Sequence, residues 1–412
     1  MTNNNDKKIL NVPPLIDKGN VIRNVPALRF PEFSGEWSKD TLQNVVAFSN
    51  GKAHESCVDE NGCYILVNSK FISTEGSVIK KATLQLSPLF KSQFVMVMSD
   101  LPNGKALAKC FYIEEDNIYT LNQRICSFTT RNRNISRFLM YQINRNKYYL
   151  RYDDGINQTN LKKGEVLACP VFIPSIQEQT KIATFIHLLD KRIATQNKII
   201  ERYESLIRGL NDSLYDQYGD DVLTSFSSLG LSYSGLSGKS AQDFGSGKPY
   251  ITYLNVYSNN IINEKDFQYV AVKEGEKQNV VEYGDVLFTL SSETPEEVGI
   301  GSVYLGNENV YLNSFCFGIH IINTKMAFPP YLSYYVSSTP FRKFIYPYAQ
   351  GSTRFNLCKA DFEKASIKLP SLENQKRIYS ILSHIESKTE TEKSLLDLYN
   401  SQKQYLLRQM FI

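Results

Sequence analysis

The segment GLSGKS at residues 235–240 contains the residue types that bind phosphate, because Gly-rich loops ending in Lys and Ser surround phosphates with main-chain N–H donors. The phosphate-loop motif requires a glycine five residues before Gly238, and that position holds Tyr233. Gly235 has the wrong spacing. The sequence therefore predicts no nucleotide site in this segment.

The segment FPPY at residues 328–331 is similar to the Asp/Asn-Pro-Pro-Tyr loop of amino methyltransferases. The first residue of that loop hydrogen-bonds an exocyclic amine, and the side chain of Phe328 has no group that can do so. No Gly-rich cofactor loop accompanies the segment. We therefore expect Pro329 and Pro330 to open a helix, where a missing N–H group is tolerated.

His54, Cys57 and Cys63 have the side-chain types of metal ligands. Their spacing matches no common zinc pattern, and no fourth ligand is evident. We therefore expect them to be ordinary loop and core residues, and we predict no metal site. The sequence also shows no convincing cluster of nuclease carboxylates, so a binding protein is favoured over a catalyst.

Basic residues gather in TTRNRNISRF at residues 129–138 and INRNKYYLRY at residues 143–152, among Asn, Thr and Tyr. Arg and Lys bind DNA phosphates, and Asn, Ser and Arg can also recognise base edges. A solvated helix face would have a similar composition, but the shared offset of Lys147 and Lys343 favours DNA contact. The candidate DNA-binding residues are Lys52, Arg131, Arg133, Arg137, Arg145, Lys147, Lys239, Ser240, Arg342, Lys343 and Arg354.

The composition indicates a globular protein without a disulfide framework. The chain has 412 residues, 42% of them hydrophobic, and a formal net charge of +4. This length predicts two or more domains, and the mild positive charge permits nucleic-acid binding without requiring it. The seven scattered cysteines, with no signal peptide and no long apolar run, predict a reducing, cytoplasmic setting and no membrane span.

An internal repeat organises the elements that must position these residues. IPSIQEQTKI at residues 173–182 recurs as LPSLENQKRI at residues 369–378, an offset of 196. The offset holds without a gap from Gly155 and Gly351 to the end of the chain. A period this long is typical of a duplicated module rather than a solenoid, and here the module is a domain followed by a helix.

Each copy of the repeat contains a long predicted helix. Ser175 and Glu178 predict a capping box at the first helix start, and Gly219 predicts its end. That helix spans about 42 residues, or roughly 60 Å. Polar residues, Gln196 and Glu392, occupy the same seam position in the two copies. The apolar and aromatic seam residues recur with the period of a coiled coil: Ile182, Ile186, Leu189, Ile193, Ile200, Tyr203, Ile207, Leu210, Ile378, Leu382, Ile385, Leu396, Tyr399 and Leu406.

We expect the two seams to pair with each other. A helical hairpin that only adds stability is the simpler interpretation, but a globular segment lies between the helices, so a rigid spacer is favoured. Residues 40–170 and 222–366 are predicted to be mixed α/β. The expected strands are 94–98, 110–113, 285–290 and 317–322, and the expected helices are 135–145 and 329–345. SNGK at 49–52 also resembles LSGKS at 236–240.

Three motifs together resemble the specificity subunit of type I restriction-modification systems. They are the duplicated helix start P-S-x-x-x-Q-x-K/R-I, the preceding G-x-x-x-x-N-L, and the opening VPALRFPEFSGEW at residues 25–37. No second RFPEF…W precedes the second domain. The resemblance implies an α+β fold with two mixed α/β target recognition domains, separated by two long antiparallel coiled-coil helices in a pseudo-twofold repeat.

The polar, turn-rich opening of the chain predicts an N-terminal extension (1–22). The repeat and the resemblance together predict recognition domains (23–172 and 219–368) and spacer helices (173–218 and 369–412), and the resemblance also implies the partners. Each domain would recognise half of a bipartite site in double-stranded DNA. Two methyltransferase subunits using S-adenosylmethionine would dock on the helices, and motor-nuclease subunits using ATP and Mg would join them. The chain itself would bind no cofactor and have no active site. A coiled-coil scaffold without sequence-specific DNA binding, or an enzyme with an unrecognised site, would be the alternatives.

Overall fold

The computed structural model describes residues 16–17, 20–21, 24–218 and 222–412. The chain forms two compact units, residues 1–195 with 396–412, and residues 196–395. The predicted polar extension lies largely outside the described residues. Its described segments, β1 (Ile16–Asp17) and β2 (Asn20–Val21), form a short antiparallel pair. Gly219, the predicted helix stop, also lies outside them.

Unit 1 contains a four-stranded antiparallel sheet in the order β4-β11-β7-β9. A three-stranded sheet, β10-β5-β6, has one parallel pair, β10 with β5. Two small pairs, β12 with β8 and β13 with β3, complete the unit. The strands are β3 (Ser38–Thr41), β4 (Val46–Asn50), β5 (Tyr64–Val67), β6 (Lys81–Ala82), β7 (Phe94–Val97), β8 (Ser99–Asp100), β9 (Cys110–Tyr112), β10 (Tyr119–Leu121), β11 (Ile125–Thr130), β12 (Thr159–Asn160) and β13 (Pro170–Ile173).

Unit 2 repeats this topology. Its four-stranded sheet has the order β15-β22-β18-β20, and its three-stranded sheet, β17-β16-β21, again has one parallel pair. The two small pairs recur as β14 with β25 and as β19 with β24, to which unit 2 adds a third strand, β23. The strands are β14 (Val222–Thr224), β15 (Gly230–Ser234), β16 (Phe244–Ile251), β17 (Gln268–Val270), β18 (Val286–Thr289), β19 (Ser291–Ser292), β20 (Gly301–Val303), β21 (Tyr311–Leu312), β22 (Cys316–Ile321), β23 (Ala349–Gln350), β24 (Phe355–Leu357) and β25 (Ile367–Leu369).

The short helices lie between these strands. In unit 1 they are α1 (Leu42–Val45), α2 (Ser69–Ser73), α3 (Ser136–Ile143), α4 (Lys147–Leu150), α5 (Lys163–Leu167) and the 3-10 turn Glu55–Cys57. In unit 2 they are α7 (Phe226–Leu229), α8 (Tyr253–Ser258), α9 (Pro329–Tyr335), α10 (Thr339–Ile345), α11 (Lys359–Lys364) and the 3-10 turns Ala241–Asp243, Glu264–Asp266, Pro295–Glu297 and Tyr346–Tyr348.

A central strand of each larger sheet is buried on both faces. All four residues of β7 are buried, with Phe94 and Met96 in one hydrophobic cluster and Val95 and Val97 in another. The same alternation occurs in β18 of unit 2, which is also fully buried. This explains why β7 is apolar throughout and β18 is apolar from Val286 to Phe288, since neither face contacts water.

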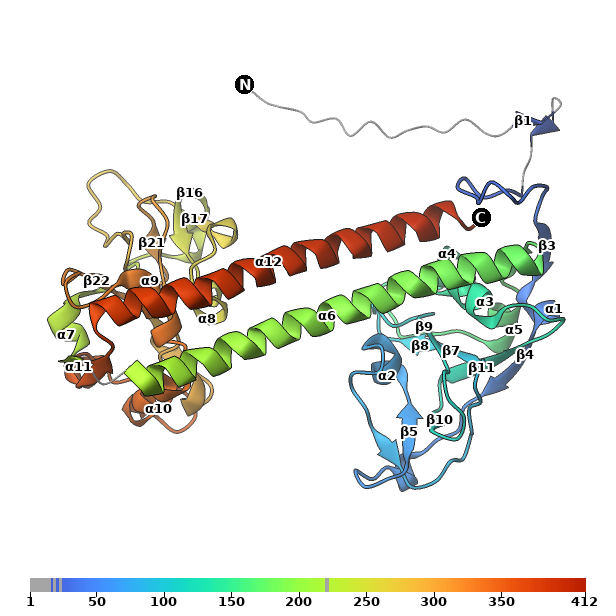
Figure 1. Cartoon of the computed structure of the whole chain (residues 1–412), viewed down its shortest axis with the longest axis horizontal. Coiled ribbons are helices and arrows are strands. Elements are labelled where there is room, and N and C mark those ends of the chain that lie inside the picture. The colour runs from blue at the N-terminus through green and yellow to red at the C-terminus, as the bar shows by residue number, and fades with distance from the viewer. Residues whose placement is uncertain (1–15, 18–19, 22–23, 219–221) are drawn as a thin grey trace. The chain divides into compact units, whose positions relative to one another are not determined.

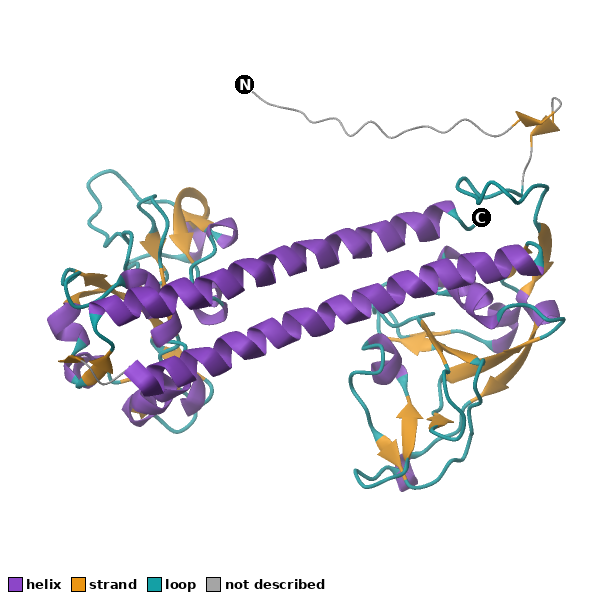
Figure 2. Cartoon of the chain, viewed as in Figure 1, coloured by secondary structure: helices purple, strands orange, loops and turns teal. Residues whose placement is uncertain are grey.

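Two long helices, α6 (Ile176–Tyr218) and α12 (Leu372–Gln409), connect these elements and are uninterrupted (Figures 1 and 2). In unit 1 the start of α6 lies beside the end of α12, where Asp190 contacts Lys403 at 2.5 Å. In unit 2 the later part of α6 lies beside the start of α12, so the pair is antiparallel, as expected. Every one of the predicted apolar seam residues is buried or half-buried.

The ends of the long helices belong to the cores of the globular parts. Ile182 and Ile186 lie in the main hydrophobic cluster of unit 1, and their repeat equivalents Ile378 and Leu382 lie in that of unit 2. Leu406 near the end of α12 joins the unit 1 cluster. The seam is therefore continuous with the domain cores, which favours a fixed attachment of each domain to its helix.

Two expectations from the sequence are corrected by the fold. Residues 329–345 form two helices, because the first ends at Tyr335 and Ser338 caps the second, its hydroxyl accepting from the Phe341 N–H at 3.3 Å. SNGK and LSGKS are also not equivalent. The counterpart of Gly51 is Gly235, since an added Cβ at either would meet the carbonyl of Asn122 or Asn313 within 2.0 Å. Both glycines are required by this close approach of the backbone.

Candidate nucleic-acid interface

Arg131 and Arg133 lie in the loop between β11 and α3, and both are exposed. The loop is held by its main chain, since the Arg131 N–H donates to the carbonyl of Val45 at 2.8 Å. Asn132 and Arg133 have positive φ values of 55° and 60°, which makes the turn tight. Within residues 24–218 and 222–412, neither arginine side chain has a hydrogen bond or ion pair. Their guanidinium groups are therefore free to bind phosphate.

Arg137, in contrast, is held by its own unit. Its guanidinium contacts Glu114 at 2.6 Å, lies 3.8 Å from the centre of the Tyr112 ring, and donates to Nδ1 of His187 at 3.0 Å. Because a guanidinium can only donate, this nitrogen of His187 accepts and must carry no proton. Partial burial, then Arg137 and Lys191, lower the pKa of His187.

Arg145 and Arg342 bind main-chain carbonyls. Arg145 contacts the carbonyls of Gly104 and Leu107 at 3.3 and 3.2 Å. Arg342 contacts those of Gly299, Glu296 and Val298 at 2.8, 2.6 and 2.7 Å. Burial lowers the pKa of Arg342. Both side chains therefore hold loops in place.

Lys239 and Ser240, from the GLSGKS segment, form a turn. The Lys239 ammonium contacts the carbonyl of Ala271 and the carboxylate of Glu276, both at 2.6 Å. That ion pair, with donors from Gln278 and the Lys273 N–H, lowers the pKa of Glu276 to about 2. Ser240 forms a capping box with Asp243. In the free chain both candidates thus have structural partners.

Lys52, Lys147 and Lys343 are exposed, and no side-chain hydrogen bond or ion pair holds them within the described ranges. Arg354 is exposed and donates to the Ser291 hydroxyl at 3.2 Å. The five remaining candidates for phosphate or base contact are therefore Lys52, Arg131, Arg133, Lys147 and Lys343, together with the lightly held Arg354.

The structural equivalence of Lys147 and Lys343 is wrong. Lys147 is the first residue of α4, after its cap Asn146, whereas Lys343 is the fifth residue of α10, after its cap Ser338. The counterpart of Lys147 is thus Thr339. The two lysines share an offset of 196 but lie at different positions of their helices, so the offset no longer supports a paired basic site.

A repeated glutamine fastens each domain to its long helix, and its role was missed from the sequence. In unit 1 the Gln179 side chain accepts from the Ile135 N–H at 3.0 Å and donates to the carbonyl of Pro174 at 3.0 Å. In unit 2 Gln375 accepts from the Phe328 N–H at 2.7 Å and donates to the carbonyl of Pro370 at 2.9 Å. The only sequence signal was the recurrence of this residue in the repeat.

The predicted capping box at the start of α6 is only half formed. The hydroxyl of Ser175 accepts from the Glu178 N–H at 3.3 Å. The Glu178 carboxylate, 1% exposed, instead contacts Arg29 with two hydrogen bonds of 2.8 Å and accepts from the Trp37 indole at 3.3 Å. Glu178 thereby fixes the segment RFPEFSGEW to the first long helix.

The middle of the helix pair is polar. The Gln196 side chain, 5% exposed, donates to the carbonyl of Glu392 at 3.1 Å and also contacts its carboxylate. Lys393 contacts Glu204 and Glu390, both at 3.2 Å. Such layers specify register and partner at some cost in stability.

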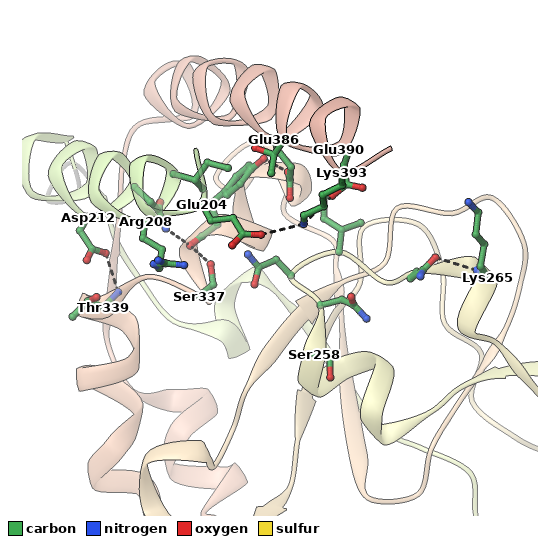
Figure 3. Close-up of a pocket in the computed structure, with 18 residues that line it drawn as sticks. Glu204, Arg208, Asp212, Ser258, Lys265, Ser337, Thr339, Glu386, Glu390 and Lys393 are labelled. Carbon is green, nitrogen blue, oxygen red and sulfur yellow. Dashed lines mark hydrogen bonds and ion pairs between the residues drawn. The ribbon is translucent and has the colours of Figure 1, made fainter. Parts of the chain in front are cut away.

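A polar cavity of about 810 Å³ lies in unit 2, between the long helices and the globular part (Figure 3). Several of its polar groups contact one another or the main chain: Lys393 contacts Glu204, Tyr334 donates to Glu386, and Asp212 accepts from the Thr339 N–H at 2.9 Å. Arg208, which also lines the cavity, donates to the Ser205 hydroxyl at 3.2 Å.

The other sequence features have structural partners. His54 is fully buried and hydrogen-bonds the carbonyl of Lys52 at 2.7 Å and the Thr120 hydroxyl at 2.8 Å. Over the described part of the chain, no group of three or more His, Cys, Asp or Glu could hold a metal ion. Pro329 and Pro330 open α9, as expected. No described helix is long and apolar enough to cross a membrane.

The repeated α+β unit and its helix connection have counterparts in a known protein family. The profile of the type I restriction modification DNA specificity domain matches residues 34–205 and 236–398. The chain belongs to this family. The specificity-domain matches correspond to the two halves of the repeat, so the chain carries the DNA-specificity role of a type I restriction-modification system.

Two solved structures share the fold of this specificity subunit. The S subunit of the type I restriction-modification system from M. genitalium is 15% identical, with a TM-score of 0.54 over 94% of this chain and 99% of that chain. A chain from a structural study of assembly and conformational transition in the type I R-M system is 16% identical, with a TM-score of 0.53 over 90% and 96%. The chain therefore spans nearly the full length of both.

Proposed function

We propose that each globular domain recognises one half of a bipartite sequence in double-stranded DNA, while the two long helices set the spacing between the halves. The observation that carries this proposal is the duplication itself. One sheet topology occurs twice, each copy fastened to a long helix by the same glutamine. Two related but divergent domains suit two different half-sites.

The long helices provide two related surfaces, which suit two copies of one partner. We propose that this partner is the methyltransferase subunit, which brings S-adenosylmethionine and methylates adenine. Motor-nuclease subunits with ATP and Mg complete the restricting complex in the cytoplasm. This chain contributes no catalytic step and binds no cofactor. Its repeat, rather than any reactive cluster, supports this division of labour.

We propose that the exposed basic side chains provide the part of the DNA affinity that does not depend on sequence. Arg131, Arg133, Lys52 and Lys147 in unit 1, and Lys343 in unit 2, are exposed and free of side-chain partners among the described residues. Each phosphate they neutralise releases counterions, which contributes affinity without sequence preference. Sequence preference must come from other groups that contact base edges.

The test is the modified-base map of a host that expresses this chain with its methyltransferase. The proposal predicts methylated adenines within one bipartite motif with a fixed spacer, and no methylation when this chain is omitted. A scaffold without sequence-specific binding would give the same map with and without it. Methylation by this chain alone would instead indicate an unrecognised active site.

A further inference from the structure

Arg145 and Arg342 hold the same loop in the two domains. The loop of residues 101–109 joins β8 to β9, and its counterpart, residues 293–300, joins β19 to β20. Arg145 precedes α4 and Arg342 lies within α10, so the two arginines occupy different chain positions. Their guanidinium groups nevertheless bind carbonyls of these equivalent loops.

An acidic side chain further orders each loop. Asp100 accepts from the N–H groups of Ala106 and Leu107 at 2.7 and 3.0 Å. In unit 2, Glu297 accepts from the Tyr257 hydroxyl at 2.7 Å and the Ser292 hydroxyl at 3.1 Å. The loops are thus fixed by several independent contacts before any partner binds, which lowers the entropy cost of recognition.

In each domain a second loop lies beside the first, and the main-chain pairing at the base of this second loop is the same in both domains. Strand β12 pairs with β8, and β24 pairs with β19. At the end of this strand, the N–H of Leu161 donates to Met98 in unit 1 and the N–H of Leu357 donates to Leu290 in unit 2, both at 2.8 Å. In unit 1, Asn103 also donates to the carbonyl of Gly155 at 3.2 Å, which joins the two loops.

The tips of the paired loops differ between the domains. In unit 1, Leu101 is 69% exposed and Ile156 is 80% exposed, although both are large and apolar. In unit 2, the exposed side chains include Glu293, Glu296 and Arg354. A constant base with divergent tips is expected where two domains present different groups to the same kind of partner.

We propose that the paired loops, residues 101–107 with 153–158 and residues 293–299 with 351–354, determine which bases each domain recognises in duplex DNA. Arg145 and Arg342 are positioning residues that act through the loops. Exposed apolar tips suit the methyl group of thymine, and Arg354 suits the acceptor edge of guanine. The assignment rests on the proposed function, since it requires that the domains recognise DNA.

The test compares methylation at the cognate motif with methylation at single-base variants of it, using the full chain with its methyltransferase. Leu101→Ala with Ile156→Ala should relax one position of the half-site of domain 1 by roughly fivefold or more, because a lost base contact removes that discrimination. Arg354→Ala and Arg342→Ala should relax only the half-site of domain 2. Spacer length and the other half-site stay unchanged.

Lys343→Ala is the matched control for Arg342→Ala, because it removes the adjacent cation, which holds no loop. It should lower methylation evenly over all sequences without altering the motif. Leu101 and Ile156 are largely exposed, so replacing them should not unfold the chain. Their variants therefore test the loops even if the Arg342→Ala protein does not fold. A normal wild-type motif that all loop-tip variants preserve would overturn this assignment. A wild-type chain that directs no motif would overturn the proposed function itself.

Discussion

Gln196 and Glu392 are repeat equivalents that contact each other. The Gln196 side chain donates to the main-chain carbonyl of Glu392 at 3.1 Å, and the two positions are separated by 196 residues, the offset of the repeat. The polar layer that sequence periodicity placed mid-seam is therefore formed, within unit 2, by equivalent positions of the two antiparallel helices.

The buried ion pair between Arg29 and Glu178 should be essential for stability. Glu178→Gln leaves the Arg29 guanidinium without its charged partner in a largely buried site, so the free energy of unfolding should fall by about 3–5 kcal/mol. Urea unfolding measures this change. The matched control is Glu32→Gln, which removes an exposed pair with Lys181 and should change the free energy of unfolding far less, because solvent screens that pair. Equal effects of the two variants would contradict the assignment.

The repeated glutamines should contribute similarly in their two units. Gln179→Ala leaves the Ile135 N–H and the Pro174 carbonyl without this hydrogen-bond partner, and Gln375→Ala does the same to their counterparts in unit 2. Each variant should lower the free energy of unfolding by about 1–3 kcal/mol, the cost of buried polar groups without partners.

The neighbouring exposed Gln177 provides the control for the repeated glutamines. Gln177→Ala should change the free energy of unfolding by less than about 0.5 kcal/mol, as is usual for a surface substitution. Hydrogen exchange of the amides that begin α3 and α9 locates the effect. If Gln179→Ala leaves exchange at Ile135 unaltered, that glutamine does not fasten the domain to its helix.

His187 should make the stability of unit 1 depend on pH. Its pKa is lowered in the folded chain, so folding favours the neutral ring that accepts from Arg137. The stabilising contribution is complete above the unfolded value of about 6.5 and is lost as pH falls below it. The positive charges of Arg137 and Lys191 lower the pKa of His187. The nearby acids Glu114 and Asp190 raise it, but more weakly.

Thermal unfolding between pH 7.5 and pH 5 measures this dependence. His187→Gln keeps an acceptor for Arg137 at every pH and should flatten the profile. His384→Gln removes an exposed histidine on α12 and should leave the profile of the wild type. Parallel profiles for the wild type and His187→Gln would exclude the contact as a source of pH dependence.

Arg131 and Arg133 should contribute affinity without sequence preference. Replacing both with Ala should weaken binding to cognate and unrelated duplexes alike, and should reduce the slope of log affinity against log salt by roughly two. Fluorescence anisotropy at several salt concentrations measures both quantities. Arg137→Ala is not an equivalent variant, because it also breaks the contacts to Glu114 and His187. An unaltered slope would place the phosphate contacts elsewhere.

The long helices were predictable because seam periodicity depends only on local sequence. Their start at the repeated Pro-Ser, and the burial of Ile182 and Ile378, follow from that pattern. The partners of Glu178 were not predictable, because Arg29 is 149 positions away and a capping box explains the same residues locally. Long-range pairing therefore decided the role of this side chain.

The basic candidates show the same limit at the interface. Sequence composition selected Arg137, Arg145, Lys239 and Arg342 together with Arg131 and Arg133. Only the fold distinguishes them, because the carbonyls that hold Arg145 and Arg342 come from loops distant in sequence. A basic residue in these segments is available to solvent or DNA only where the fold brings no main-chain carbonyls close enough to bind its side chain.

The spacing of the two half-sites tests the central claim most directly. Seven residues inserted at equivalent points of α6 and α12 preserve the seam and lengthen the helix pair by about 10 Å. That length corresponds to roughly three base pairs of DNA at about 3.4 Å each. The modified-base map should then show both half-sites unchanged and a spacer longer by about three base pairs. The same half-sites at the original spacing would contradict the account.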